Sequence, residues 1–113
     1  MELNHVQEGE IAVITIKGNL DAATAPVAGN AIKKIMEEDC PRILLNLNDL
    51  EYLGSDGFRV ILGAVKDIKR KKGKLVLCSL NQFVKEIFVV SGSESLIPIE
   101  DTIDSGIKQL GLN

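Results

Sequence analysis

The hydroxyl of Ser55 is the side chain best placed for chemistry in this sequence. It lies in a polar break, Gly54-Ser55-Asp56-Gly57, between an apolar run typical of a strand and an apolar-striped run typical of a helix. A serine becomes a nucleophile only beside a base. The single histidine, His5, belongs to a predicted edge strand near the N-terminus, and the G-x-S-x-G elbow is absent because residue 53 is leucine. We therefore predict no catalytic residue and no enzyme activity.

Other reactive groups give no cofactor or metal site. The sequence contains neither a Walker A loop nor a G-x-G-x-x-G loop after a strand. Asp49 and Glu51 lack histidine or cysteine partners at ligand spacing, and they fit a solvated turn better. The two cysteines, Cys40 and Cys78, have neither the number nor the spacing of a disulfide framework or a zinc knuckle. We predict buried or idle thiols, no metal and no cofactor.

A hydroxyl between a strand and a helix has two other uses. Ser55 could cap the helix by accepting from the free N–H of residue 57 or 58, with Asp56 near the positive end of the helix dipole and Gly57 allowing a close turn. The preceding strand would also deliver the hydroxyl to the carboxyl-end rim of the sheet, where partners and ligands commonly bind. A phosphate there could be held by helix N–H groups while it changes the surface that a partner meets. Capping and phosphorylation both remain open on these residues alone.

Composition limits the classes of partner. The chain has 113 residues, a 45% hydrophobic content and a net charge of -3, which describe one globular domain spanning residues 1–113. A pI near 5.1 argues against nucleic acid as a partner, because phosphate binding needs an excess of Lys and Arg. The polar N-terminus lacks a signal sequence, and no apolar run approaches the roughly 20 residues that span a bilayer. We expect a cytoplasmic protein without a membrane partner.

The remaining pattern predicts an α/β fold with a mixed sheet of about five strands and about four helices. Apolar runs at 10–18, 42–47 and 74–79 are predicted strands, and residues 2–7 are expected to pair with the first of them through a turn at Glu8-Gly9. Segments of helical period alternate with these strands, which favours parallel pairing. The helical stripes are expected to contain the following residues: Val27, Ala31, Ile32, Ile35 and Met36; Phe58, Ile61, Leu62, Val65 and Ile68; Phe83, Val84, Ile87 and Phe88; and Ile103, Ile107 and Leu110.

Two details concern the predicted second helix. Its core stripe leaves Val60, Gly63 and Ala64 tending outward beside Ser55, so we expect them at a contact surface. A basic run, residues 69–72, precedes Gly73, which is expected to end the helix. The run fits a solvated helix end, where cations complement the dipole, and a patch for an acidic partner is the alternative.

With these motifs in place, the sequence resembles the bacterial anti-sigma-factor antagonists of the STAS superfamily. Gly18-Asn19-Leu20-Asp21 is similar to their G-E-L-D-like motif. The segment ILLNLNDLEYLGSDGFRVILGAVK is similar to their strand, D-L-S-like turn and D-S-S-G or D-S-T-G motif, and GKLVLCSLNQFVKEIFVVSG resembles their third segment. The resemblance covers nearly the whole chain in register and implies a single STAS-like domain.

The resemblance implies a binding switch. In that family the unmodified antagonist binds an anti-sigma factor that is also a serine kinase, which frees the sigma factor. Phosphorylation of the first serine of the D-S-S-G motif ends the binding, and a serine phosphatase resets it. By position that serine is Ser55 here. The expected partner-binding residues are Asp21, Gly54, Asp56, Gly57, Val60 and Ala64.

The sequence departs from the family motif on both sides of the serine. Gly54 stands where the family has Asp, and Asp56 stands where it has a second Ser or Thr. A carboxylate has thus moved from one side of Ser55 to the other. These departures favour the alternative function, a scaffold or ligand-sensing STAS module that is not phosphorylated. A small hydrolase using Ser55 is a third and more distant alternative.

Overall fold

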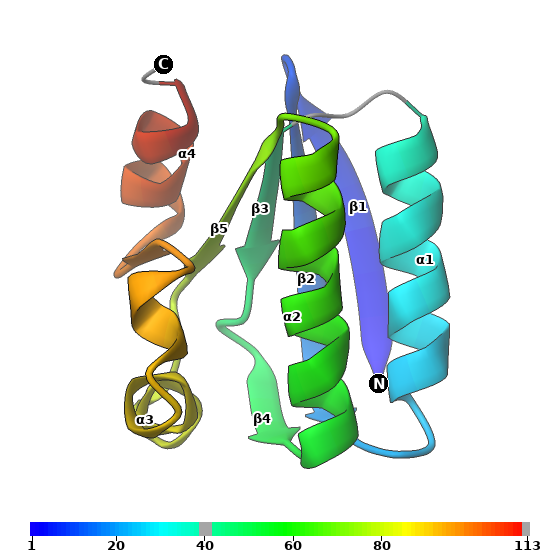
Figure 1. Ribbon diagram of the computed structural model, residues 1–113, viewed down its shortest axis with the longest axis vertical. Coiled ribbons are helices and arrows are strands. Elements are labelled where there is room, and N and C mark those ends of the chain that lie inside the picture. Colours follow the sequence, from blue (N-terminus) through cyan, green and yellow to red (C-terminus); the bar gives the residue numbers. More distant parts are fainter. Residues whose placement is uncertain (39–41, 112–113) are drawn as a thin grey trace.

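The structure is a computed structural model that describes residues 1–38 and 42–111 (Figure 1). Its strands are β1 (Glu2–Glu8), β2 (Ile11–Leu20), β3 (Arg42–Asn46), β4 (Leu50–Leu53), β5 (Lys74–Cys78) and β6 (Ile99–Glu100). Its helices are α1 (Ala25–Glu37), α2 (Ser55–Arg70), α3 (Gln82–Val90) and α4 (Ile103–Gly111), with a short 3-10 turn, η1 (Ser93–Ser95). The predicted α/β class is confirmed.

One mixed sheet organises the chain. The strand order is β1-β2-β3-β5-β6, and β4 pairs with β2, with a shift of register between Gly18 and Asn19. β1 is antiparallel to β2, and the other pairs are parallel. Within residues 1–38 and 42–111 the sheet has six strands, against about five predicted. The two-residue β6 is too short to show a pattern in sequence. The hairpin turn is at Gly9 and Glu10, one residue later than predicted, with Gly9 at a positive φ of 61°.

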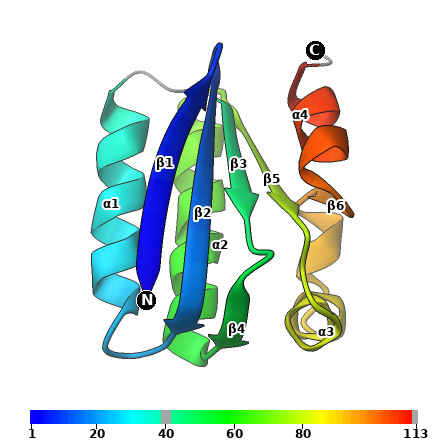
Figure 2. The ribbon, with the colours of Figure 1, turned by 180° about the vertical axis from the view of Figure 1, so that it is seen from behind.

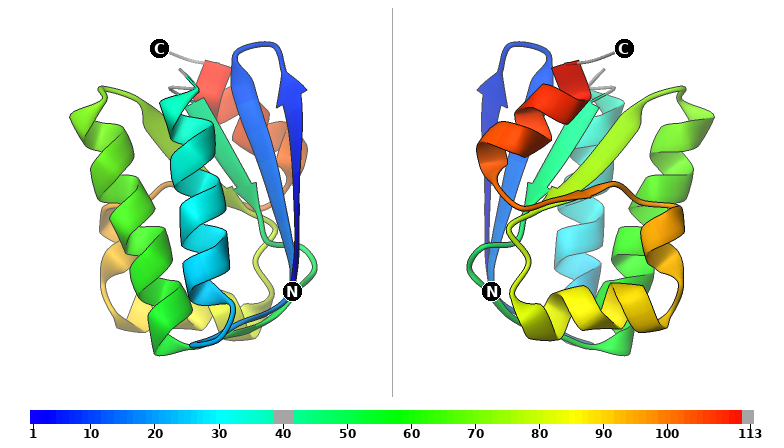
Figure 3. Two further views of the ribbon diagram at one scale, coloured as in Figure 1. Left: turned by 90° about the vertical axis from the view of Figure 1, so that its right-hand side faces the viewer. Right: turned by 90° about the vertical axis from the view of Figure 1, so that its left-hand side faces the viewer.

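Helices cover both faces of the sheet unequally. α1 and α2 lie on one face, α4 lies behind β3 and β5, and α3 runs across the lower end (Figures 2 and 3). β3 is buried on both sides, because Ile43 and Leu45 join the core under α1 and α2 while Leu44 joins the core under α4. This explains why β3 is a continuous apolar run in sequence rather than an alternating one.

The start of α1 and the end of α2 each differ from the prediction at one residue. Val27 is 59% exposed, because Pro26 in the first turn sets the start of α1 so that its neighbours Ala25 and Ala28 face the sheet. At the end of α2, Lys72 rather than Gly73 adopts the left-handed conformation, with φ 60°. The Gly73 N–H then donates to the Ile68 carbonyl at 2.8 Å, which closes the helix.

The other groups considered for chemistry are the two cysteines and the possible metal ligands. Cys78 is buried with a free thiol, and burial raises its pKa, partly offset by a hydrogen bond from Ser79. Cys40 lies outside the described residues. Among residues 1–38 and 42–111, no group of three or more His, Cys, Asp or Glu side chains is arranged to hold a metal ion. Within those same ranges, no helix has the length and apolar character needed to cross a membrane.

Candidate functional site

Ser55 is the first residue of α2 and lies on the surface. The predicted N-cap role is wrong by one position, because Gly54 is the N-cap, with φ -90° and ψ 178°, and no side chain caps this helix. The Gly54 N–H donates to the Leu20 carbonyl at 2.9 Å, and its carbonyl accepts from the Phe58 N–H at 2.9 Å. These bonds fix the helix start through the backbone. The Ser55 hydroxyl is therefore not needed to cap the helix.

Gly57 seats the first turn of α2 against the sheet. A Cβ at this position would lie 2.6 Å from the Leu20 carbonyl oxygen and 2.9 Å from Cδ1 of Leu53. Only glycine leaves room for this approach of a helix to the ends of β2 and β4. Gly57 is buried, so it is not available for direct contact with a partner. Its role is to position Ser55.

Asp21 organises the loop between β2 and α1. Its carboxylate accepts from the Thr24 N–H at 3.1 Å, the Ala23 N–H at 3.0 Å and the Thr24 hydroxyl at 3.1 Å. In return, the Asp21 N–H donates to the Thr24 hydroxyl oxygen at 2.9 Å. The hydrogen bond from the Thr24 N–H, supported by the other two, holds the pKa of Asp21 below its ordinary value. Asp21 is therefore a charged, locally ordered neighbour of the α2 start.

We expect the charge of Asp21 to stabilise the fold in a pH-dependent way. Because its folded pKa is lowered, its contribution is present above the unfolded value, about pH 4, and is lost as the pH falls through the folded pKa. Asp21→Asn keeps an acceptor oxygen but removes the charge. The melting temperature of wild type should exceed that of Asp21→Asn at pH 7, and the difference should shrink below about pH 4. A difference independent of pH would contradict this role.

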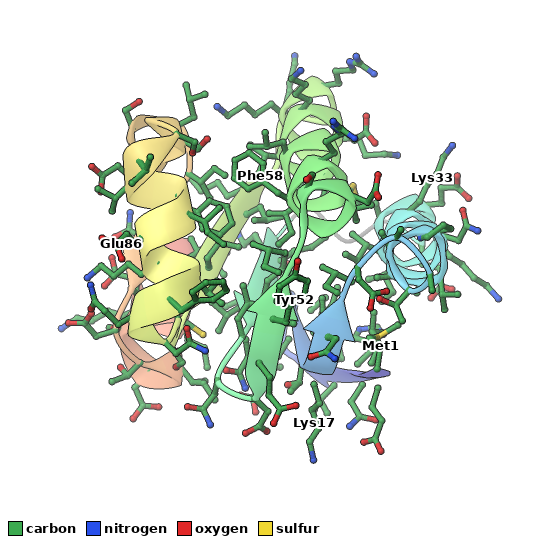
Figure 4. The ribbon with its side chains drawn as sticks, turned by 90° about the horizontal axis from the view of Figure 1, so that it is seen from below. Met1, Lys17, Lys33, Tyr52, Phe58 and Glu86 are labelled. Atoms are coloured by element: carbon green, nitrogen blue, oxygen red, sulfur yellow. The ribbon has the colours of Figure 1, made fainter. Side chains whose placement is uncertain are left out.

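The loop that contains Asp21 and the start of α2 at Ser55 meet at one end of the molecule. A Cβ built on Gly54 would lie 3.8 Å from the Asp21 Cα and 3.3 Å from the Tyr52 ring. The predicted site residues Asp21, Gly54 and Ser55 are thus brought together. Figure 4 looks onto this end, where Tyr52 lies between α3 and the loop that leads to α1.

An exposed aromatic pair borders Ser55 on the side of α3. The rings of Tyr52 and Phe83 stack with centroids 6.3 Å apart, although Tyr52 is 47% exposed and Phe83 is 53% exposed. The sequence places Phe83 in the core stripe of α3, which is wrong, because Val84 and Phe88 take the buried positions. Spacing alone could not find this pair, since Tyr52 lies in β4 and Phe83 lies in the first turn of α3, 31 positions later.

On its other side, Ser55 is bordered by a groove between α1 and α2. The groove is lined by Ala22, Ala25, Pro26, Asp56, Arg59 and Val60. Arg59 pairs with Asp56 at 3.3 Å on the exposed surface of α2. Sequence reasoning missed Arg59, although its position three residues after Asp56 on a predicted helix was a usable signal.

Two of the predicted contact residues are more buried than expected. Val60 is half-buried, and its methyl groups would lie 3.5 to 3.6 Å from a Cβ built on Gly29 of α1. Ala64 is only 6% exposed and belongs to the core, so its predicted place on the outer face of α2 is wrong. The cause is α1, which packs on this side of α2 and covers a face that the stripe of α2 alone suggests is open.

Ser55 has no histidine partner. His5, the only histidine in the chain, lies exposed on the edge strand β1, where its ring nitrogen pairs with the Gln7 side chain at 3.0 Å. Asp56, next to Ser55, pairs instead with Arg59. The arrangement is an exposed hydroxyl at a helix start between a groove and an aromatic pair, which suits recognition by another protein better than catalysis.

Comparison with known proteins identifies the family. The protein-family model of the STAS domain matches residues 2–106, and the chain therefore belongs to the STAS domain family. Among its relatives, the anti-sigma F factor antagonist of Paenibacillus polymyxa is 29% identical over 101 residues, which cover 88% of this chain and 86% of the relative.

Solved structures show the same fold. An anti-sigma factor antagonist from Mycobacterium paratuberculosis matches with a TM-score of 0.90 at 18% identity, covering 97% of this chain and 93% of that chain. The Bacillus cell fate determinant SpoIIAA in its phosphorylated form matches with a TM-score of 0.77 at 19% identity, covering 96% of this chain and 98% of that chain. The single STAS-like α/β domain expected from the sequence is confirmed.

Proposed function

We propose that this protein is an anti-sigma factor antagonist that binds an anti-sigma factor with serine kinase activity and so releases a sigma factor. The relative from Paenibacillus polymyxa, named as an anti-sigma F factor antagonist, aligns over most of both chains and supports this proposal. The observation that carries it is the position of Ser55, an exposed hydroxyl at the start of α2 that caps nothing. The proposal places the protein in the cytoplasm, where transcription is regulated.

The switch in this proposal is phosphorylation of Ser55 by the anti-sigma factor, reversed by a serine phosphatase. The SpoIIAA structure that shares this fold is of a phosphorylated form. In this chain, the first intrahelical bond of α2 runs from Phe58 to Gly54, so the earlier N–H groups are directed to the helix end beside Ser55. A phosphate on Ser55 would gain from these groups and from the helix dipole.

The same phosphate would meet two carboxylates. Asp56 is next in the chain and Asp21 lies in the adjoining loop, but Asp56 is already paired with Arg59. Attraction to the helix start and repulsion from the carboxylates oppose each other, and each is on the order of 1 kcal/mol at an exposed site. The fold should therefore tolerate the modification. A partner covering Ser55 would instead have to bury a doubly charged group, which costs far more.

The contact surface in this proposal includes Ser55, Asp21, Gly54, Asp56, the half-buried Val60 and the groove between α1 and α2. Ala64 is not part of it, because it is buried, and Gly57 acts by seating the helix. The shift of the carboxylate from residue 54 to residue 56 leaves the serine flanked by one acidic side chain. We expect Asp56, with Arg59, to take the place of the missing aspartate in kinase recognition.

The test is a direct phosphorylation assay. The purified protein is incubated with MgATP and, one at a time, each anti-sigma factor kinase encoded in the source genome, and the product is analysed by peptide mass spectrometry. We expect one phosphate, on Ser55, with one of these kinases, and none on Ser55→Ala. Stable binding to an anti-sigma factor without phosphate transfer would favour the unmodified scaffold function instead. Neither binding nor transfer with any of the kinases would contradict the proposal.

A further inference from the structure

The outer edge of β5 is only partly covered. β6 pairs with Leu77 and Cys78 at the end of β5, and among the described residues no strand continues this pairing beside Val76 or Leu75. The Leu77 N–H donates outward, to the Pro98 carbonyl at 3.0 Å. Alternate residues of a parallel strand turn their backbone groups to the same neighbour, so Leu75 also directs its N–H and C=O to this side. An open strand edge is a template for another extended chain.

An apolar groove lies along this open edge. Its walls are the C-terminal half of α2, the start of β5, the segment between η1 and β6, and Gln109 of α4. The apolar lining residues include Val65, Ile68, Leu75, Val76, Leu96 and Pro98. Leu96 is 59% exposed at its rim. The volume, about 210 Å³, is below the roughly 300 to 1,000 Å³ of small-molecule sites. The groove therefore suits one apolar side chain of a longer ligand.

The groove lies beside a basic stretch of the chain. Residues 66–74 contain six Lys or Arg side chains and one Asp, Asp67, which pairs with Arg70 at 3.3 Å. Lys69 and Lys74 line the groove, and Lys69 Nζ donates to the Leu96 carbonyl at 3.4 Å. A cationic rim around an apolar slot selects a ligand that is acidic on both sides of an apolar residue.

From these features we infer a second docking site, which binds an extended acidic segment of a partner protein with an apolar anchor residue. The anchor fills the groove between Leu75 and Leu96, the flanking carboxylates face the lysines, and the backbone hydrogen-bonds to Leu75 as an added strand. The groove adjoins residues 65–69 and Ser55 starts the same helix. The rise of an α-helix separates Lys69 from Ser55 by about 21 Å, so a partner at one site leaves the other open.

The experiment uses a synthetic peptide, acetyl-EDLEIDE-amide, titrated into the isotope-labelled protein and followed by two-dimensional NMR. We expect saturable shifts centred on the amides of Leu75, Val76 and Leu96. A matched peptide with the leucine and isoleucine replaced by serine has the same charge but no anchor, and it should bind at least about tenfold more weakly. Equal binding of the two peptides would overturn the proposal by showing charge attraction alone.

Protein variants locate the site independently. Leu96→Asp and Lys69→Glu change exposed side chains, so their spectra should report a folded protein, and each should weaken binding of the anchored peptide at least about tenfold. Lys33→Glu makes the same charge change on the far helix α1 and should leave the affinity within about twofold. Unchanged affinity in Leu96→Asp would overturn the proposal. Shifts confined to the Ser55 end, or dimer formation through β5 in sedimentation, would do so as well.

Discussion

Replacing Gly57 by alanine should lower the free energy of unfolding by about 3 kcal/mol, within the range for forcing extra atoms into a packed interior. The new methyl would lie 2.6 Å from the Leu20 carbonyl oxygen. This oxygen cannot simply move aside, because it accepts the Gly54 N–H at 2.9 Å and belongs to the end of a central strand. Relief requires α2 to tilt away from the sheet. Urea unfolding of both proteins measures the difference.

The matched control is Gly63→Ala, six residues further along the same helix. A Cβ at Gly63 has no neighbour within 4 Å. Alanine is favoured over glycine in a helix interior by about 0.5 to 1 kcal/mol, so this variant should be slightly more stable than wild type. If Gly57→Ala and Gly63→Ala have the same unfolding midpoint, the close approach of α2 to Leu20 does not hold in solution.

Ser55→Asp should weaken binding to the cognate anti-sigma factor by at least about a hundredfold, because a carboxylate buried in the interface without a partner costs several kcal/mol. Its melting temperature should stay within about 2 °C of wild type, since Ser55 is exposed and caps nothing. Calorimetric titration and thermal unfolding on the same samples separate the two effects. The prediction rests on the proposed function and on the position of Ser55 at the helix start.

Two further variants of Ser55 isolate charge from shape. Ser55→Asn has nearly the size of the aspartate variant without its charge, and Ser55→Ala removes the hydroxyl. Both should bind the anti-sigma factor within about tenfold of wild type, because neither buries a charge. Equal loss of affinity in the Asn and Asp variants would show that the interface excludes a larger side chain at residue 55 whatever its charge. Retained affinity in the Asp variant would show that Ser55 lies outside the interface.

Most of the fold could be predicted because its core elements follow regular periods. β2, β3 and β5 are apolar runs, and α2 carries its buried residues Ile61, Val65 and Ile68 at helical spacing. Prediction failed where a neighbouring element decided the outcome. Ala64 is covered by α1, and β6 is a strand only because its two residues pair with the end of β5. Neither effect is visible within one segment of sequence.

The candidate site was predictable to the level of its motif and no further. The residues around Ser55 could be named from the sequence, but the cap at Gly54 depends on a backbone bond to Leu20, which is distant in the chain. The stacked pair of Tyr52 and Phe83 likewise joins two elements. Residues that meet only in the folded chain leave no spacing signal, and these are the ones that the structure added.

The bond between Gly54 and Leu20, together with the fit of Gly57, has a consequence for substrate design. It makes Ser55, the proposed phosphate acceptor, part of a three-dimensional epitope, because residues 50–60 alone lack β2 and the loop that contains Asp21. A free peptide of that length would have to be ordered by the kinase itself, at about 1 to 2 kcal/mol for each residue fixed. Grafting GSDG onto a flexible tail should therefore give a poor phosphate acceptor, whereas transplanting the whole domain should carry the regulation with it.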